Sequence, residues 1–308
     1  MKKLNILFLG GGRRVALARN FLNILNKRYN TKIFAYEIDK SSSFSQVGKI
    51  ILGKQWRNRN IFYNLKYNIK KYKIDLIIPC TDPATIVAAE LAEKNKELNI
   101  PISTLFSVKI CFDKLELYNY LKNKNINLIP LEKKLFPIFA KPRNGSASIG
   151  CYKIKNQKEM NNFFLNIDKK NYIFQKYIQG KEYTVDVYIN NNNRIEGIVS
   201  RERVRVMHGE SIFIKTTLIK KIDIEVKKII RAFDNQLKGP ITFQFIKNKK
   251  KFFLLEINPR VSGGINASIY SGLNIPFYLV RDYYNLDTKF KFKFKKVQMV
   301  KYFEEMKI

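Results

Sequence analysis

The first 105 residues alternate short apolar runs with stretches of helical spacing, and this constrains the fold more than any other feature of the chain. Residues 4–9 form an apolar run that ends at three glycines, and residues 15–25 follow with helical spacing. Further strands are predicted at 32–38, 76–79 and 100–103, with a helix at 84–94. Because strands alternate with helices, a parallel sheet with right-handed crossovers is expected.

After residue 107 the pattern changes to strands that pair locally. Residues 183–189 and 195–205 alternate like antiparallel strands around a turn, and residues 242–246 and 252–257 predict a hairpin. Other expected elements are helices at 113–122, 158–165 and 222–235, and strands at 136–141, 152–155 and 172–177. Local pairing after a parallel first third indicates a second type of fold.

The net charge of +33, from 58 basic and 25 acidic residues, raises the question of a polyanionic partner. A basic nucleic-acid-binding protein stays an alternative, but its basic residues should then cluster on one face. The lysines are instead spread along the chain, together with many Asn, Ile, Phe and Tyr residues, as a genome poor in G and C would give. We therefore expect no specific nucleic-acid partner. Residues 289–294 alternate Lys and Phe, which predicts an edge strand with its lysines outward.

Apolar runs and cysteines point to a cytoplasmic protein. No apolar run approaches the length that spans a bilayer, and the run at 4–9 is too short for a signal peptide. We expect a cytoplasmic location and no membrane partner. Cys80, Cys111 and Cys151 are odd in number and far apart, so they are predicted to be buried or idle thiols.

The glycine turn Gly10-Gly11-Gly12 is followed by Arg13 and Arg14 at the start of a predicted helix. With Glu37 after the second strand, a nicotinamide-dependent oxidoreductase is one alternative, although Val15 occupies the last glycine position of that fingerprint. Two arginines at a helix N-terminus also suit a carboxylate, and solvated arginines on a plain turn fit equally well.

A substrate site is expected at the edge of the sheet where this turn lies. The carboxyl ends of parallel strands meet at one edge, so Thr81 and Asp82 should arrive beside Arg13 and Arg14. The loop with Ser262 and Gly263 is the other expected contributor to substrate specificity.

A phosphate site is predicted where Lys141 ends a strand and a loop of small residues follows, at 144–150. Small residues such as Ser146 and Ser148 let backbone amides approach a polyphosphate, and a lysine supplies a point charge. Residues 175–178 are predicted to be extended, so their backbone could hydrogen-bond an adenine edge, and Glu182 could accept ribose hydroxyls. Taken alone, residues 175–182 also fit a plain strand followed by a turn.

A metal site is predicted on the hairpin. Glu256 and Asn258 lie two residues apart, so they share one face of a strand, and Gln244 on the preceding strand can face them. Oxygen ligands beside a phosphate site suit Mg²⁺, which takes few protein ligands. Arg260 follows where a transferring phosphoryl group would need positive charge.

The glycine turn with its two arginines, the Lys141 loop and the Glu256–Arg260 cluster, in this order and with these separations, resemble the ATP-grasp superfamily. The motifs Lys-Pro-Arg-Asn-Gly-Ser-Ala-Ser and Glu-Ile-Asn-Pro-Arg resemble especially those of the branch that contains the carbamoyl-phosphate synthetase large subunit. The resemblance implies that this chain is a stand-alone single ATP-grasp unit. The resemblance implies a Rossmann-like parallel α/β pre-ATP-grasp domain at 1–107. A two-lobed ATP-grasp domain of mixed α/β and α+β type would follow at 108–308, with a small lobe at about 108–177 and a large lobe at about 178–308.

The resemblance also implies roles for individual residues. Lys114 and Lys141 would contact the ATP phosphates, with Lys141 and Arg260 as the catalytic residues and Arg260 steadying an acyl-phosphate. The adenine hinge would be Gln175, Lys176 and Ile178, the ribose ligand Glu182, and the metal ligands Gln244, Glu256 and Asn258. His208 lies in a stretch similar to a family loop near the nucleotide. Two departures are that Gln175 stands where many relatives have Glu, and that Gln244 replaces a commoner carboxylate.

The expected function is that of an ATP- and Mg²⁺-dependent ligase, with Mn²⁺ as an alternative ion. It would phosphorylate a small carboxylate and join it to an amine or a similar nucleophile. A half-sized carbamate-phosphorylating unit is the alternative within the family. The partners expected are small carboxylate and amine substrates, and a homodimer is left open.

Overall fold

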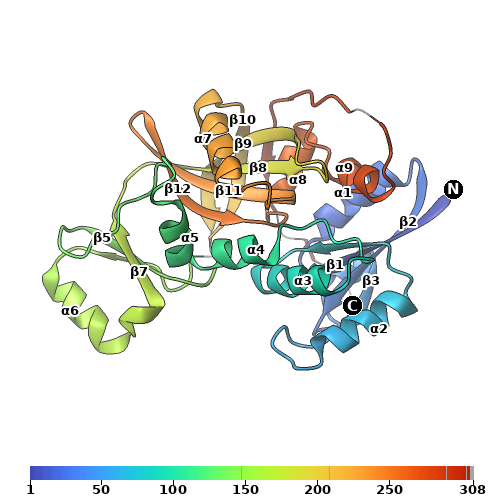
Figure 1. Cartoon of the computed structure of the whole chain (residues 1–308), viewed down its shortest axis with the longest axis horizontal. Coiled ribbons are helices and arrows are strands. Elements are labelled where there is room, and N and C mark those ends of the chain that lie inside the picture. Colours follow the sequence, from blue (N-terminus) through green and yellow to red (C-terminus); the bar gives the residue numbers. More distant parts are fainter. Residues whose placement is uncertain (147, 208, 289, 303, 306–308) are drawn as a thin grey trace.

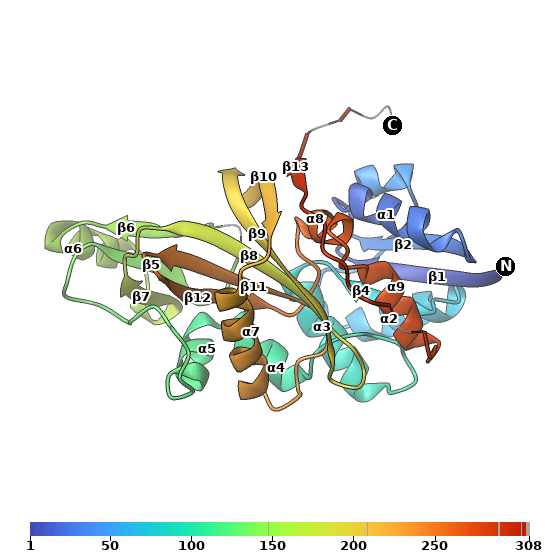
Figure 2. The same cartoon turned by 90° about the horizontal axis from the view of Figure 1, so that it is seen from above.

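The computed structural model describes residues 1–146, 148–207, 209–288, 290–302 and 304–305, which form three β-sheets with helices packed against them. A small antiparallel sheet lies at one end of the molecule and the parallel sheet at the other, with a six-stranded sheet between them (Figures 1 and 2). The mixed α/β fold with a parallel sheet in the first third is confirmed.

The parallel sheet has the strand order β3-β2-β1-β4. Its strands are β1 (Lys2–Leu9), β2 (Tyr29–Glu37), β3 (Lys49–Leu52) and β4 (Leu76–Pro79), and its helices are α1 (Val15–Leu25), η1 (Ser43–Gln46), α2 (Ile61–Lys71) and α3 (Asp82–Lys94). Alternate residues of β1 enter two different cores. Ile6 and Phe8 pack with α1 on one face, and Leu7 and Leu9 pack with α2 and α3 on the other.

The six-stranded sheet is antiparallel, in the order β12-β11-β8-β9-β10-β13. Its strands are β8 (Lys181–Ile189), β9 (Ile195–Met207), β10 (Glu210–Thr217), β11 (Gly239–Asn248), β12 (Lys251–Asn258) and β13 (Gln298–Val300). Three helices cover one face, namely α4 (Leu105–Phe112), α5 (Lys114–Leu121) and α7 (Lys220–Ala232). The predicted hairpin is the β11–β12 pair.

The small sheet has the order β6-β5-β7. Its elements are β5 (Ile138–Pro142), β6 (Tyr152–Ile154), α6 (Gln157–Asn166), η2 (Lys169–Asn171) and β7 (Tyr172–Lys176). Met160 of α6 joins Ile138 and Phe174 in a separate core, so this sheet and its helix have an apolar interior of their own.

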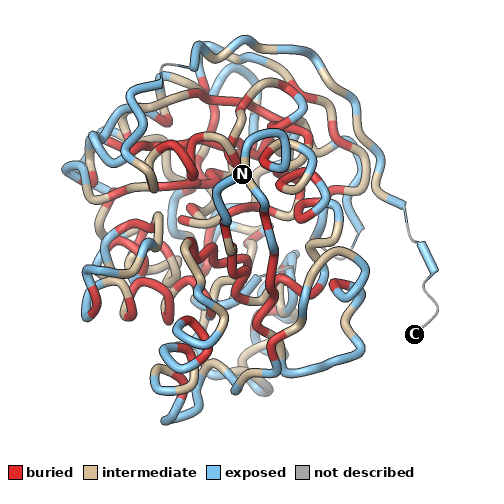
Figure 3. Tube along the Cα trace, turned by 90° about the vertical axis from the view of Figure 1, so that its right-hand side faces the viewer, coloured by how far each residue is buried: buried red, intermediate tan, exposed pale blue. Residues whose placement is uncertain are grey.

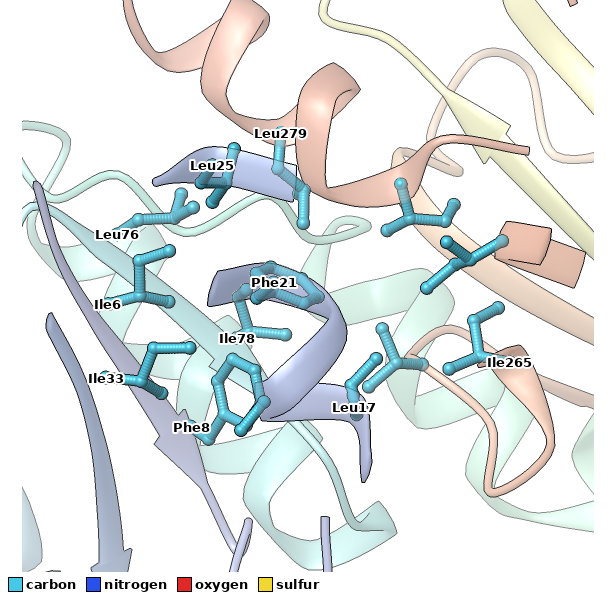
Figure 4. Packing of buried hydrophobic residues seen from close by; sticks show 14 of the residues in the cluster. Ile6, Phe8, Leu17, Phe21, Leu25, Ile33, Leu76, Ile78, Ile265 and Leu279 are labelled. Carbon is cyan, nitrogen blue, oxygen red and sulfur yellow. The ribbon is translucent and has the colours of Figure 1, made fainter. Parts of the chain in front are cut away.

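The parallel sheet and the six-stranded sheet share one apolar core. Helices α8 (Ile265–Tyr270) and α9 (Ile275–Tyr283) bring Ile265 and Leu279 against Phe21 of α1 and its neighbours (Figure 4). Burial is therefore continuous across the middle of the molecule, while Tyr302, Glu304 and Glu305, which are described beyond β13, are exposed (Figure 3).

Two predicted strands are wrong. Residues 100–103 form an irregular connection in which Ile102 is buried, and in the described structure the neighbouring Asn99 carbonyl accepts one backbone bond, from Ile77 N of β4. Residues 290–294 likewise form no strand, and Phe292 and Phe294 pack on the shared core. The edge strand forms afterwards, as β13 on β10.

Two other expectations from the sequence can be compared with the structure. All three cysteines are free, with Cys80 and Cys111 buried. Over the described part of the chain, none of the helices is both long and apolar enough to cross a membrane.

Candidate active site

A cleft of about 950 Å³ is bordered by all three sheets and holds most of the predicted site residues. The predicted residues that line it are Arg13, Arg14, Thr81, Asp82, Lys114, Lys141, Ser146, Ser148, Glu182, Gln244, Glu256, Asn258, Arg260, Ser262 and Gly263. Clusters that lie far apart in the sequence therefore meet in one place.

The predicted adenine hinge lies outside the lining of this cleft. Gln175 is buried in β7, and its Nε2 donates to the carbonyl of Ile129 at 3.4 Å. Its Oε1 has no hydrogen-bond partner in the described structure, so a buried acceptor is left open at this position. Lys176 and Ile178 do not line the cleft either. His208 lies outside the described residues.

Lys141 and Lys114 border the loop of small residues. Lys141 lies at the end of β5 with only 6% of its surface exposed, and its Nζ donates to the carbonyl of Leu255 at 3.3 Å. Burial lowers the pKa of Lys141 to about 8, although the nearby Glu256 carboxylate raises it. Nζ of Lys114 donates to the carbonyl of Gly145 at 2.9 Å. Two amines therefore lie beside the loop that was predicted to cradle phosphate.

The position of Lys114 is set by the cap of α5. Asp113 accepts from the backbone amides of Leu115 and Glu116, and it pairs with Arg143 across 2.7 Å. The amide of Lys114 also donates to the carbonyl of Arg143 at 2.9 Å. Helix and loop are therefore tied together just before the small residues.

Three oxygen-bearing side chains meet on the β11–β12 hairpin, as the strand alternation predicts. Gln244 lies opposite Glu256 in the ladder, and Glu256 Oε1 accepts from the side-chain amides of Gln244 and Asn258, the latter at 3.2 Å. Only one of the three is a carboxylate, and the described residues contain no cluster of three His, Cys, Asp or Glu side chains.

This donor set fits one hard divalent cation. An amide that turns over presents its oxygen in place of its nitrogen, so all three side chains can offer oxygen from the same face. Mg²⁺ prefers oxygen and completes its shell with phosphate and water, so few protein ligands suffice.

Arg260 contacts helix α3, which follows strand β4 of the parallel sheet. Its Nε forms an ion pair with Asp82 Oδ1, and the two side chains are 13% and 14% exposed. Asp82 is the first residue of α3, whereas Arg260 follows β12. One predicted catalytic residue and one predicted substrate residue therefore form a pair across the cleft.

Glu37 is hydrogen-bonded to the glycine turn. The amide of Gly12 donates to Glu37 Oε1 at 2.6 Å, and the hydroxyl of Ser42 donates to the carbonyl of Gly12 at 2.9 Å. Burial raises the pKa of Glu37, an effect that the Gly12 amide partly offsets. Gly10 has φ +70, and a Cβ there would lie 2.8 Å from the Thr81 hydroxyl. Glu37 therefore holds the turn closed.

Arg13 and Arg14 both face the cleft but differ in attachment. Arg13 is exposed, whereas Arg14 is half-buried, with its Nη2 3.4 Å from the carbonyl of Cys80. A Cβ on Gly263 would lie 3.0 Å from Arg14 Nη1, so this loop and this guanidinium are neighbours.

The positive charges near Arg13 and Arg14 change the pKa of Glu210. Burial alone would raise the pKa of Glu210. The ion pair with Lys301 and the positive charges of Arg14 and Arg13 together outweigh this effect, so the pKa is lowered overall. The sequence reasoning missed Glu210 and Lys301, because the pairing of β13 with β10 brings Lys301 into the cleft.

The sequence reasoning also missed Arg201 and Arg203, which reach the cleft from β9. Arg203 pairs with Glu182, with 3.1 Å between Nε and Oε2, and its Nη2 donates to the carbonyl of Gly209 at 2.9 Å. Their spacing of two was the available signal, because residues i and i+2 share one face of a strand.

Part of the chain matches a known protein family. Residues 168–306 match the family described as ATP-grasp in the biosynthetic pathway with Ter operon. The chain is 28% identical over 202 residues to the carbamoyl phosphate synthase large chain of Clostridium botulinum (strain Loch Maree / Type A3). That match covers 57% of this chain and 19% of the relative, so the chain spans about a fifth of its length.

Two further likenesses cover more of the other protein. The D-alanine–D-alanine ligase of Clostridium botulinum (strain Alaska E43 / Type E3) is 26% identical over 171 residues, which are 49% of this chain and 57% of that ligase. The N5-carboxyaminoimidazole synthetase of Staphylococcus aureus, solved with ADP, superposes with a TM-score of 0.77 at 19% identity, over 97% of this chain and 83% of that one. The chain therefore has an ATP-grasp domain, with homologues among the large chains of carbamoyl phosphate synthase.

Proposed function

We propose that this protein is an ATP- and Mg²⁺-dependent ligase that activates a small carboxylate as an acyl-phosphate and joins it to an amine. The observation that carries the proposal is the meeting in one cleft of Lys141, the Glu256 oxygen cluster and the Arg260–Asp82 pair. The expected division also stays part of the proposal, with a domain at 1–107 and a two-lobed ATP-grasp domain at 108–308.

The proposed nucleotide contacts follow the small-residue loop. Lys114 and Lys141 would neutralise the phosphates, with the backbone around Ser146 and Ser148 close enough for amide contacts because the side chains are small. Glu182, half exposed at the cleft, would accept from the ribose hydroxyls. The open acceptor on Gln175 would receive the adenine amino group, which supports keeping Gln175, Lys176 and Ile178 as the adenine hinge.

Glu256, Gln244 and Asn258 would hold Mg²⁺, and Mn²⁺ is an alternative because it has similar oxygen preferences. When bound, the ion would neutralise charge on the transferring phosphoryl group. The single carboxylate would make the metal site weaker than one built from two carboxylates.

The proposed reaction has two steps. An oxygen of the substrate carboxylate attacks the γ-phosphorus of ATP, and ADP leaves. The amine nitrogen then attacks the acyl carbon, inorganic phosphate leaves, and the nitrogen loses a proton to form the amide. Arg260 would stabilise negative charge on the phosphoryl group, while Arg13, Arg14, Thr81, Asp82 and the Ser262–Gly263 loop would hold the substrates.

One alternative within the family is favoured by a specific observation. The likeness to carbamoyl phosphate synthase large chains supports a unit that phosphorylates bicarbonate or carbamate. A nicotinamide-dependent oxidoreductase is disfavoured, because Glu37 is already bonded to the Gly12 amide instead of being free for a ribose.

Phosphate release is the experiment that tests the proposal. The purified protein is incubated with Mg·ATP and a panel of carboxylates, each with pooled amino acids and also with bicarbonate alone. Release that needs both a carboxylate and an amine supports the ligase, and release with bicarbonate alone favours the alternative. Calorimetry that gives tight NAD binding and no binding of Mg·ATP would overturn both.

A further inference from the structure

Beneath the cleft, Asp186 of β8 and Arg201 of β9 form an ion pair that is almost wholly buried. Asp186 is 0% exposed and Arg201 is 2% exposed, and their contacts are 2.6 Å from Nε to Oδ2 and 3.1 Å from Nη2 to Oδ1. Burying two charges is costly unless every remaining donor and acceptor is satisfied, and an apolar pair of the same size often gives equal stability. Stability alone therefore gives little reason for this pair.

Three hydroxyl groups from separate elements complete the coordination of Asp186. Thr242 of β11 and Ser262 of the loop after β12 each donate to Oδ1 at 3.0 Å, and Ser268 of α8 donates to Oδ2 at 2.5 Å. Ser262 also accepts from Arg201 Nη2 at 2.8 Å. The hydroxyl of Ser262 is therefore occupied by this network.

The network fixes the segment that carries Arg260. The Thr242 hydroxyl lies 3.3 Å from the carbonyl oxygen of Arg260, and the amide of Arg260 donates to the carbonyl of Asn258 at 2.8 Å. A Cβ on Gly264 would lie 2.3 Å from Arg201 Nη1, so the loop is packed directly on that guanidinium. The carbonyl of Arg260 is thus linked to the buried pair through Thr242, and Gly264 at the other end packs on Arg201.

We propose that Asp186 and Arg201 are positioning residues, which hold the backbone of residues 260–264 so that Arg260 faces the cleft. The inference rests on the proposed function for its catalytic meaning, but the backbone constraint itself does not depend on any activity. The two charges act through Ser262 and Thr242, and the hydrogen bonds found for them in the described structure go to none of the residues assigned to the nucleotide.

Two serine substitutions give a matched comparison. Replacing Asp186 or Arg201 would leave a buried charge without a partner and unfold the chain, so the hydroxyl groups are the better targets. Ser262→Ala and Ser268→Ala each remove one hydroxyl from the same carboxylate, but only Ser262 lies in the loop that follows Arg260 and also accepts from Arg201. Thr242→Val is a second test variant with nearly the same shape.

Hydrogen–deuterium exchange of a peptide that covers residues 259–265 is the first readout. We expect exchange to rise about tenfold in Ser262→Ala and Thr242→Val and to stay near wild type in Ser268→Ala. With a substrate pair found by the phosphate-release screen, kcat should fall in the first two variants, while the dissociation constant of Mg·ATP stays unchanged.

The outcomes separate this inference from the proposed function. Equal exchange in all three variants, or kcat losses that follow the losses in thermal stability, would mean that the network serves the fold only and would overturn the inference. If the wild-type protein turns over no carboxylate, the proposed ligase fails, but the exchange comparison still decides whether the pair positions residues 260–264.

Discussion

Arg260 and Asp82 are 178 positions apart in the sequence, and their side chains form an ion pair across the cleft. This pair joins the segment after β12 to the first turn of α3, so it connects the six-stranded sheet to the helices of the parallel sheet. The guanidinium also lies 3.2 Å from the carbonyl of Val261 through its Nη1. Its direction is therefore fixed before any ligand arrives, as expected of a group that must meet developing charge.

We predict that Asp82→Asn lowers kcat about tenfold, and that Arg260→Ala lowers it by about 10² or more. The asparagine keeps the shape of Asp82 but loses the charge that orients Arg260. Steady-state phosphate release with saturating Mg·ATP is the measurement.

The control for Asp82→Asn is Asp282→Asn. Asp282 also forms a partly buried pair with an arginine, 2.7 Å from Arg281, but it does not line the cleft. The control variant should lose stability and keep its turnover. Equal losses of kcat in the two variants would mean that Asp82 acts only through the fold.

We predict that Glu256→Gln lowers turnover by about 10² and weakens the Mg²⁺ dependence of nucleotide binding. Glu256 is the one carboxylate among the three clustered oxygen ligands, so its loss leaves no charge to hold the ion. Calorimetric titration of ADP with and without Mg²⁺ measures the effect. Unchanged Mg²⁺ dependence would place the metal elsewhere.

The converse substitution, Gln244→Glu, should tighten divalent-metal binding about tenfold, because two carboxylates would then face each other across the β11–β12 ladder. Without metal the two like charges repel, so the thermal midpoint should fall and then recover on adding Mg²⁺. Gln179→Glu is the control, since Gln179 is exposed and outside the cleft. If the control variant responds equally, the change in metal binding and thermal midpoint comes from net charge and not from the position of the new carboxylate.

Nucleotide affinity should fall as the pH rises through about 8, because Lys141 then loses the proton that phosphate binding requires. Burial lowers the pKa of Lys141 to about 8 from its ordinary 10.5, despite the opposing effect of Glu256. Binding of a polyanion should raise this pKa, so the complex takes up a proton near pH 8. Calorimetry in buffers of different ionisation enthalpy measures the uptake, and Lys141→Arg should abolish it.

The same pKa shift affects stability in the opposite direction. Between pH 8 and 10.5 the unfolded chain holds more protons on this lysine than the folded chain does. The contribution of Lys141 to the free energy of unfolding therefore increases with pH across this interval. Denaturant titrations of the wild type and of Lys141→Arg should diverge there.

The local parts of the site follow from the sequence, because short-range geometry fixes them. Glu256 and Asn258 face the same way since a strand repeats every two residues, and the glycine turn is placed by β1 and α1. The Arg260–Asp82 pair could not be predicted in this way. It depends on how the parallel sheet and the six-stranded sheet pack, and their shared core joins residues far apart in the chain.

The wrong strands have a common cause. Apolar alternation reports burial, and in residues 290–294 it reflects Phe292 and Phe294 against the shared core, without strand pairing. Helix α2 was missed although Ile61, Leu65 and Ile69 repeat at helical spacing, because aromatic residues, lysines and asparagines mixed over the other positions obscure the apolar stripe.

The last prediction concerns the carboxylate end of the substrate. Arg13 is exposed toward the cleft, and within the described structure no hydrogen bond or ion pair of its side chain is seen, whereas Arg14 is braced against Cys80 and the Gly263 loop. We expect Arg14→Ala to raise the KM for the carboxylate about tenfold or more, because bidentate pairing with a half-buried guanidinium is lost. Arg13→Ala should have a smaller effect, since an exposed charge is screened by solvent. Arg19→Ala, one turn further along α1 and outside the cleft, is the control. If ATP affinity falls while the KM for the carboxylate stays, these arginines belong to the nucleotide site.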